Sequence, residues 1–211
     1  MATFVDTLPL ENALSFVLPY VNGCPPQTVI FHLRQAAIEF MRKTLAWQMQ
    51  LDPVQSVVGQ GVYAIPLPDD SRVVKILRYK LGTRYESSLL TPSQGRGYRD
   101  DDRGIEGIWS DDLTNFNVTP LPLKVEPMTL TVALRPDERA LEIPENIYEQ
   151  YIQCIAYGAI STISDIPRQS FTDAGVAAAK GSQFRDEIAS VAARVSKGSS
   201  SASGRVRSYH Y

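Results

Sequence analysis

The stretch QTVIFHLRQAAIEFMRKTLAW, residues 27–47, is the strongest structural signal in the sequence. Apolar residues recur along it every three or four positions, and this spacing predicts one long amphipathic helix. Pro25 and Pro26 directly precede the stretch. Prolines suit a helix start because the first N–H groups of a helix have no partner inside it. A shorter helix is expected before it, around residues 10–21, with Pro19 near its end. The predicted apolar face of the long helix consists of Ile30, Leu33, Ala37, Phe40, Met41 and Thr44.

The sequence changes character between residues 48 and 136. Prolines and glycines separate short segments rich in Val, Ile, Tyr and Thr, a composition typical of β-strands. Residues 128–134 alternate apolar and small polar side chains, which predicts a strand with one buried face. Residues 73–81 alternate less regularly. The predicted strands are residues 47–58, 61–65, 72–81, 86–89, 115–119 and 127–134.

Helical spacing returns after Pro144 and again from about residue 172 to residue 195. In the first of these helices, Ala156, Gly158 and Ala159 are small enough to let a neighbouring helix approach closely. Helices, a β-rich middle and further helices, in this order, indicate an α+β fold. The expected division is N-terminal helices over residues 1–47, a β-rich domain over 48–136, C-terminal helices over 137–195, and an extended arm over 196–211.

The arm has the composition of a flexible linker, because Ser and Gly dominate it as far as residue 204. Its positive charges have no acidic side chain to offset them, and aromatic residues follow at the end. Three interpretations stay open: docking into a protein groove through Tyr and Arg, contact with nucleic acid through charge and stacking, or a terminus without a role. The charged and aromatic residues are Lys197, Arg205, Arg207, Tyr209, His210 and Tyr211.

Length and composition narrow the function further. The chain has 211 residues, 44% of them hydrophobic and 21% charged, as is usual for a globular protein. Its formal net charge of −2 argues against nonspecific wrapping of nucleic acid as the main task. Two cysteines and two histidines are too few for a zinc site or a disulfide framework. The sequence shows no run of apolar residues long enough for a membrane span and no secretion signal at its start, so the cytosol of the producing cell is the expected compartment.

A cluster of carboxylates lies in the glycine-containing stretch over residues 95–112. Carboxylate oxygens are the ligands that Ca²⁺ prefers, but the alternating spacing and the closing Glu of a calcium loop are absent. Arg96, Arg99 and Arg103 lie among the acids and offset their charge locally, so a solvated loop is the favoured interpretation. The acidic residues of the cluster are Asp100, Asp101, Asp102, Glu106, Asp111 and Asp112.

No catalytic set emerges from the remaining residues. Phosphate-loop, dinucleotide-binding and nucleophile-elbow patterns are missing from the sequence. His32 lies in the long helix beside a core position, so a hydrogen-bonded structural imidazole is expected. Cys24 has no evident histidine partner, and Cys154 is most simply a small apolar side chain. We therefore expect no enzyme activity and no cofactor.

Taken in order, several segments resemble the head-to-tail adaptor, or connector, proteins of tailed double-stranded DNA phages. The resemblance covers roughly residues 10–195, and residues 95–114 fit it least and look like a variable loop. Each segment is weak alone, and their order and spacing carry the likeness. The segments are RQAAIEFMRK (34–43), WQMQ (47–50), YAIPLPD (63–69), RVVKIL (72–77), NVTPLP (117–122), LTVALRP (130–136), and IPE (143–145) leading into AYGA (156–159).

The resemblance implies a structural virion protein that forms a ring, typically of twelve copies, between the portal and the tail tube or nozzle. It implies a four-helix bundle with an inserted β-rich domain, and a C-terminal arm that climbs onto the portal. Genomic DNA would pass through the ring without specific binding, no membrane would be involved, and the chain would be made in the host bacterial cytoplasm and end in the virion neck. The residues expected to contact the portal are Lys197, Arg205, Val206, Arg207, Tyr209, His210 and Tyr211.

Two further functions belong to other classes. A metal-dependent enzyme would use the carboxylates of residues 95–112, and metal analysis of the purified protein separates it from an adaptor. A DNA-binding accessory protein would use the arm, and its DNA affinity would be sensitive to salt and to loss of the arm.

Overall fold

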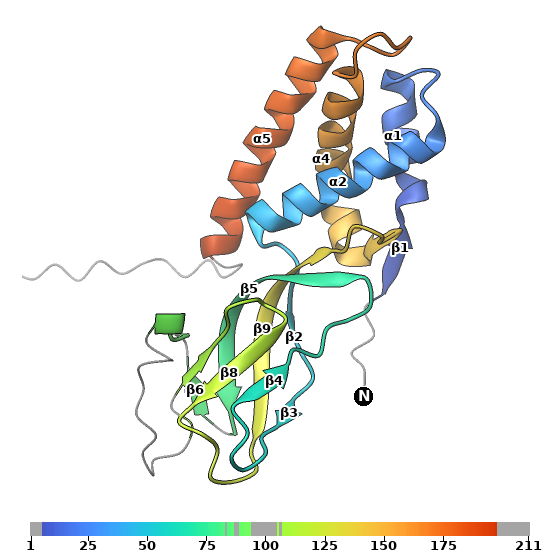
Figure 1. Ribbon diagram of the computed structural model, residues 1–211. Coiled ribbons are helices and arrows are strands. Elements are labelled where there is room, and N and C mark those ends of the chain that lie inside the picture. The colour runs from blue at the N-terminus through green and yellow to red at the C-terminus, as the bar shows by residue number, and fades with distance from the viewer. Residues whose placement is uncertain (1–5, 83, 87–88, 94–104, 106, 198–211) are drawn as a thin grey trace, which may run out of the picture.

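A computed structural model describes residues 6–82, 84–86, 89–93, 105 and 107–197, and in it the helices gather at one end of the molecule and most strands at the other (Figure 1). The long helices are α2 (Pro26–Thr44), α4 (Glu145–Ser164) and α5 (Ala174–Lys197). The sequence-based prediction of these three helices is confirmed. The first helical segment is shorter and consists of the 3-10 turn η1 (Leu10–Ala13), the single α-helical turn α1 (Leu14–Val17) and the 3-10 turn η2 (Leu18–Tyr20).

The expected four-helix bundle with an inserted β-rich domain is wrong. The described residues form an α+β fold with four α-helices and three antiparallel sheets. One helix, α1, is a single turn, since 3-10 turns flank it on both sides and Pro19 lies in the second of them. Strands also lie outside the predicted insertion, because β1 (Thr7–Pro9) pairs with β10 (Glu142–Pro144) beside the helices.

Small residues let the long helices approach closely, as predicted. A Cβ atom placed on Gly158 of α4 would lie 2.9 Å from ring atoms of Phe184 in α5 and 3.0 Å from Cβ of Ala36 in α2. The Ser161 hydroxyl donates a hydrogen bond of 2.8 Å to the carbonyl oxygen of Ala177, which also joins α4 to α5. The three helices therefore meet at a contact that only a residue without a side chain fits.

The largest sheet has the strand order β2-β9-β5-β6, with β3 also paired to β9. A second sheet has the order β4-β8-β7, and buried side chains of both sheets belong to one continuous apolar core that includes the helices. The strands of the largest sheet are β2 (Gln48–Gln50), β3 (Val54–Gln55), β5 (Ser71–Leu81), β6 (Arg84–Glu86) and β9 (Pro127–Pro136). Those of the second sheet are β4 (Val62–Ala64), β7 (Gly107–Trp109) and β8 (Asn115–Thr119).

Two irregularities in β5 explain why residues 73–81 alternate poorly in the sequence. Val73 pairs with Leu134 and Lys75 with Ala133, so that Val74 is an extra residue. Leu77 is a second extra residue, between the pairs of Ile76 with Val132 and Arg78 with Thr131. Each bulge shifts the alternation by one position, so Ile76 and Tyr79 both face the core although they are three residues apart.

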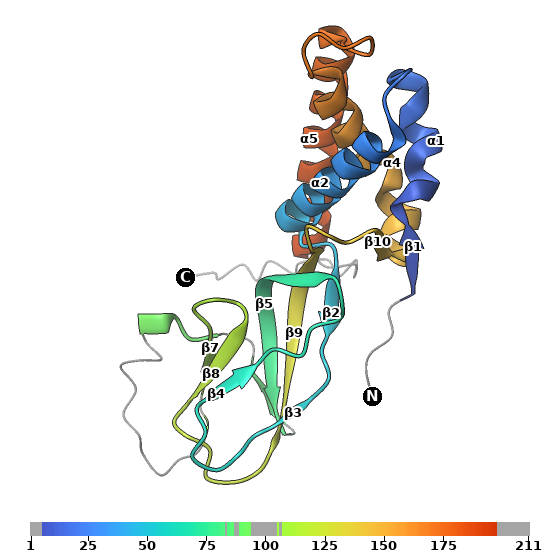
Figure 2. The same ribbon diagram turned by 45° about the vertical axis from the view of Figure 1, so that its right-hand side comes forward.

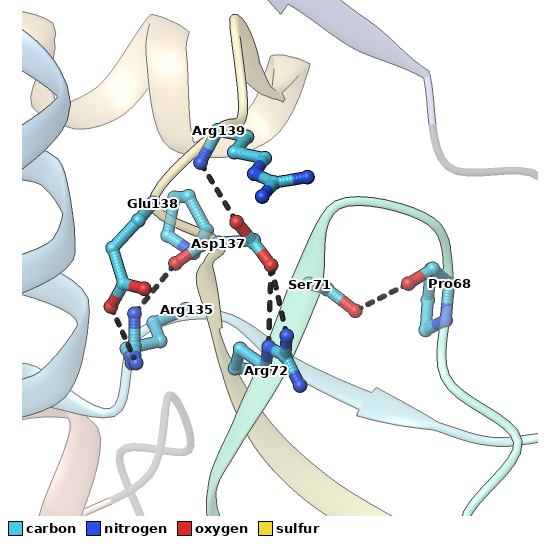
Figure 3. A network of polar contacts seen from close by, with 8 residues as sticks. Pro68, Ser71, Arg72, Arg135, Asp137, Glu138 and Arg139 are labelled. Carbon is cyan, nitrogen blue, oxygen red and sulfur yellow. Dashed lines mark hydrogen bonds and ion pairs between the residues drawn. The ribbon is translucent and has the colours of Figure 1, made fainter.

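A network of polar contacts joins the sheet to the segment that leads back to the helices (Figure 3). Asp137, directly after β9, accepts a hydrogen bond of 2.7 Å from the backbone N–H of Arg139 and forms an ion pair of 3.2 Å with Arg72 of β5. These contacts lower the pKa of the Asp137 carboxyl, the backbone bond from Arg139 having the largest effect. Beside them, Arg135 contacts Glu138 at 3.3 Å. The network therefore holds the turn between the two parts of the fold.

Candidate interaction surfaces

The predicted portal-binding arm begins at the end of α5. Lys197 is the last residue of that helix and is exposed. The other residues predicted to contact the portal lie outside the described residues, so their role stays a prediction. They are Arg205, Val206, Arg207, Tyr209, His210 and Tyr211.

Only part of the carboxylate cluster can be placed. Asp100, Asp101, Asp102 and Glu106 lie outside the described residues, whereas Asp112 lies in an exposed turn. Its carboxylate accepts hydrogen bonds of 2.9 Å from the backbone N–H groups of the two residues after Leu113. These bonds lower the pKa of Asp112 and give the carboxylate a structural role in the turn. Within the part of the chain that is described, no three acidic, His or Cys side chains gather as a metal site would require.

Part of the stretch expected to be a solvated loop is a strand instead. Residues 107–109 form β7, which pairs with β8, and Ile108 is fully buried. The sequence signal for this strand is short, and the charged residues around it obscure it. Asp111 and Asp112 therefore follow a core strand directly and are not part of one long loop.

His32 is a structural residue, as expected. Its Nδ1 atom lies 3.0 Å from the hydroxyl oxygen of Thr162 in α4. That hydroxyl donates its proton to the carbonyl oxygens of Gly158 and Ala159, at 3.2 and 3.0 Å, so it accepts the hydrogen bond from His32. Partial burial lowers the pKa of His32. The imidazole therefore joins α2 to α4 in its neutral form.

Neither thiol is prepared for nucleophilic chemistry. Cys24 and Cys154 are both buried and unpaired. Burial raises the pKa of Cys24, and burial together with the negative charge of Glu187 raises the pKa of Cys154 to about 12. A thiol must ionise to act as a nucleophile or a metal ligand. Both cysteines therefore act as small apolar side chains near neutral pH.

The most conspicuous surface lies at the end of the sheets farthest from the helices, where the loop before β4 meets the loop before β9 (Figures 1 and 2). Aliphatic side chains on these two loops and on β4 are exposed to solvent. We call this surface the aliphatic tip. Its residues, with their exposed fractions, are Val57 (52%), Val58 (59%), Val62 (54%), Leu121 (37%), Leu123 (55%) and Val125 (65%).

Ser56 fastens the two loops of the aliphatic tip together. Its side chain is fully buried, donates a hydrogen bond of 2.9 Å to the carbonyl oxygen of Lys124, and accepts one of 2.8 Å from the N–H of Glu126. A backbone hydrogen bond of 3.0 Å from Gly59 to Pro122 also links the loops. The exposed side chains are therefore carried on paired backbone segments, which lowers the entropy lost when a partner binds.

Tyr63 of β4 supports the first loop from below. Its hydroxyl accepts a hydrogen bond of 2.9 Å from the N–H of Val57 and donates one of 2.8 Å to the carbonyl oxygen of Gln60. Its ring stacks on Phe116 of β8, with ring centroids 5.4 Å apart. The loop is therefore fixed to the core of the second sheet.

Sequence reasoning missed the aliphatic tip. Residues 57 and 58 were expected to belong to a strand, and no role was assigned to residues 121–125. The available signal was the set of apolar residues within the proline- and glycine-rich runs VVGQGV (57–62) and PLPLKV (120–125). Apolar residues placed in loops, and not in strands, are candidates for a contact surface because a folded core does not use them.

Large aromatic side chains are also exposed on the helical part. Phe16, Tyr20 and Phe31 are 38%, 49% and 47% exposed. The ammonium group of Lys180 in α5 lies 4.7 Å from the ring centre of Tyr20 and 4.2 Å from that of Tyr157 in α4, a pair of cation–π contacts. The helical part thus presents aromatic contact groups at a separate place from the aliphatic tip.

No protein-family model matches this chain, and no curated protein matches it by sequence. None of the helices among the described residues combines the length and the apolar character needed to cross a membrane.

Proposed function

We propose that this chain is a structural head-to-tail adaptor of a tailed double-stranded DNA phage. In this proposal, copies of the chain form a ring between the portal and the tail tube or nozzle, and the ring continues the DNA channel. The chain has no catalytic task and joins other proteins. Its place is the neck of the virion, after synthesis in the bacterial cytoplasm.

The observation that carries the proposal is the aliphatic tip. Six aliphatic side chains, from 37% to 65% exposed, lie on two loops that the buried Ser56 holds together. Exposed apolar clusters on a stable backbone are typical of protein interfaces. We assign the aliphatic tip to the tail tube or nozzle protein, because it lies at the opposite end of the molecule from the helices.

Two further observations support a joining role. The resemblance to the adaptor family extends through the helices and strands that surround the core. Three described groups that could serve an enzyme are in structural use: His32 bonds to Thr162, Asp112 closes a turn, and Cys154 is a buried protonated thiol. The arm, residues 196–211, is assigned to the portal, which gives the protein one contact for each partner.

The two assignments can be tested separately with the portal and nozzle proteins encoded by the same phage. Removing residues 198–211 is expected to abolish binding to the portal ring and to leave binding to the nozzle protein unchanged. Replacing Val58 and Leu123 by Asp is expected to have the opposite effect. A matched control replaces the exposed residues Asn22 and Gln27 by Asp, since both lie in the helical part of the chain, away from the aliphatic side chains.

The measurements are sedimentation of mixtures with each partner and thermal unfolding of each variant. The Val58→Asp, Leu123→Asp variant should keep the unfolding midpoint of the full chain, because both side chains are more than half exposed. Portal binding without the arm would refute the role of the arm. Unchanged nozzle binding by the Val58→Asp, Leu123→Asp variant would refute the role of the aliphatic tip.

A further inference from the structure

The bulges in β5 place positive charges on the solvent side of the largest sheet. Lys75 and Arg78 are three positions apart, so in a regular strand, without the extra residue Leu77, their side chains would point to opposite faces. With it, Lys75 and Arg78 pair with Ala133 and Thr131, two positions of β9 that share a face. Both cationic residues therefore lie on the face opposite the core, and both are exposed.

This face forms one wall of a groove where the sheet meets the helices. The groove has a volume of about 820 Å³. The end of α2 and the last residues of α5 form its other sides. The residues that line it are Lys43, Thr44, Leu45, Gln48, Lys75, Leu77, Arg78, Thr131, Ala192, Val195, Ser196 and Lys197.

The lining of the groove is positive. Among the described residues that line it, four are cationic and none is acidic. Lys43 is the one whose charge is offset, by an ion pair of 2.6 Å with Glu39. Lys75, Arg78 and Lys197 have no ion pair with any residue in the described part of the chain. This concentration of charge stands out in a protein whose net charge is −2.

The lining is also partly apolar, and this feature selects the class of partner. Leu45, Leu77 and Val195 lie in the groove beside the cationic residues. Single-stranded nucleic acid is recognised by aromatic side chains on which its bases stack, and none of the described lining residues is aromatic. Duplex DNA requires an extended basic surface, which an acidic protein with one local groove does not offer. A peptide segment that carries carboxylates and aliphatic side chains satisfies both parts of the lining.

We propose that this groove binds an acidic, aliphatic peptide segment of a partner protein. The carboxylates contact Lys75, Arg78 and Lys197, and the aliphatic side chains pack on Leu77 and Val195. Gln48 and Thr131 supply hydrogen-bonding groups beside them. This inference does not depend on the proposed role in a phage, since it rests on the groove alone.

The test measures binding of a fluorescein-labelled peptide of alternating Glu and Leu to the full-length protein by fluorescence anisotropy. The Lys75→Gln, Arg78→Gln variant is expected to bind the peptide about tenfold more weakly, because two ion pairs are lost. Raising the salt concentration should weaken binding to the unchanged protein. A peptide in which Ser replaces Leu should also bind more weakly, because it cannot use the apolar part of the groove.

A matched control removes the same charge elsewhere. Arg42 and Arg168 are exposed and line no part of the groove, so the Arg42→Gln, Arg168→Gln variant should bind the peptide as tightly as the unchanged protein. The charge-reversed Lys75→Glu, Arg78→Glu variant should instead bind a peptide of alternating Lys and Leu. That gain of binding requires a folded groove, so it separates loss of charge from loss of structure.

Three results would overturn the proposal. Equal loss of binding in both Gln variants would show that net charge, and not the groove, holds the peptide. Absence of binding to the Glu-Leu peptide by the folded, unchanged protein would remove the site. Tighter binding of single-stranded or duplex DNA than of the peptide, lost in the Lys75→Gln, Arg78→Gln variant, would assign the groove to nucleic acid.

Discussion

Replacing Ser56 by Ala tests whether the aliphatic tip is held on a fixed backbone. The Ser56 hydroxyl is fully buried and serves two backbone groups of the opposite loop, the carbonyl oxygen of Lys124 and the N–H of Glu126. Alanine fills nearly the same space without either hydrogen bond. The substitution therefore removes the fastening of the two loops and leaves the apolar core as it is.

The size of the effect follows from the two groups that lose their partner. A buried polar group left without a hydrogen bond costs about 1–3 kcal/mol. Water can reach part of the loop, because the side chains of Lys124 and Val125 are exposed. The lower end of the range therefore applies to each group, and the free energy of unfolding should fall by about 2 kcal/mol. For a chain of this length, the midpoint of thermal unfolding should fall by about 5 °C.

Urea unfolding measures the loss of stability, and amide hydrogen exchange measures its location. The Ser56→Ala variant should exchange the N–H of Glu126 roughly thirtyfold faster, because about 2 kcal/mol of lost free energy changes the opening equilibrium by this factor. The exposed Ser182 provides the control, since its side chain makes only a long hydrogen bond of 3.5 Å to Asp186 among the described residues. Ser182→Ala should change the free energy of unfolding by less than about 0.5 kcal/mol. A Ser56→Ala variant as stable as the Ser182→Ala control would refute the reasoning.

Three further predictions concern the helices. The pKa of Cys154, raised to about 12, predicts that a disulfide reagent at neutral pH labels this thiol only after unfolding; labelling of the native protein would contradict it. Burial lowers the pKa of His32 below 6.5 in the folded state. The contribution of His32 to stability is therefore complete above pH 6.5 and is lost as the pH falls through the pKa that His32 has in the folded protein. Denaturant melts of the unchanged protein and of His32→Asn should converge in acid. Gly158→Val should reduce the free energy of unfolding by about 1–3 kcal/mol, because the new side chain overlaps Phe184 and Ala36, and an unchanged urea midpoint would disprove that contact.

The long helices could be predicted from the sequence because each buries a continuous apolar face. Periodic spacing alone located α2, α4 and α5 to within a few residues of their observed ends. The N-terminal segment could not be predicted in the same way. Its buried residues Leu10, Ala13 and Val17 have helical spacing, but the backbone there winds mainly as 3-10 turns. Spacing of three or four residues does not distinguish these two kinds of turn, so a helix was predicted there. The four-helix bundle itself was an implication of the resemblance to the adaptor family.

Strands whose apolar and polar side chains alternate clearly were predicted, whereas short strands without such a pattern were missed. β8 lies where it was expected, and β9 extends two residues further. β1 and β10 have three residues each and exist because they pair across the whole chain, which no local pattern reveals. The bulges of β5 are likewise fixed by its pairing with β9.

The contact surfaces depend on tertiary structure more than the fold does. The aliphatic tip requires that loops 60 or more residues apart lie side by side, and the hydrogen bond between Ser56 and Lys124 brings them together. The basic groove requires three strands and the ends of two helices. Single side chains such as His32 and Cys154 could be interpreted from sequence, since one neighbouring core position indicates their burial.

The mass of the portal ring after mixing with the purified chain is the most direct test of the joining role. Mass photometry should show portal rings that gain the mass of several copies of the chain, and rings mixed with the chain lacking residues 198–211 should gain none. Portal rings that keep their original mass beside a folded, full-length chain would contradict the account.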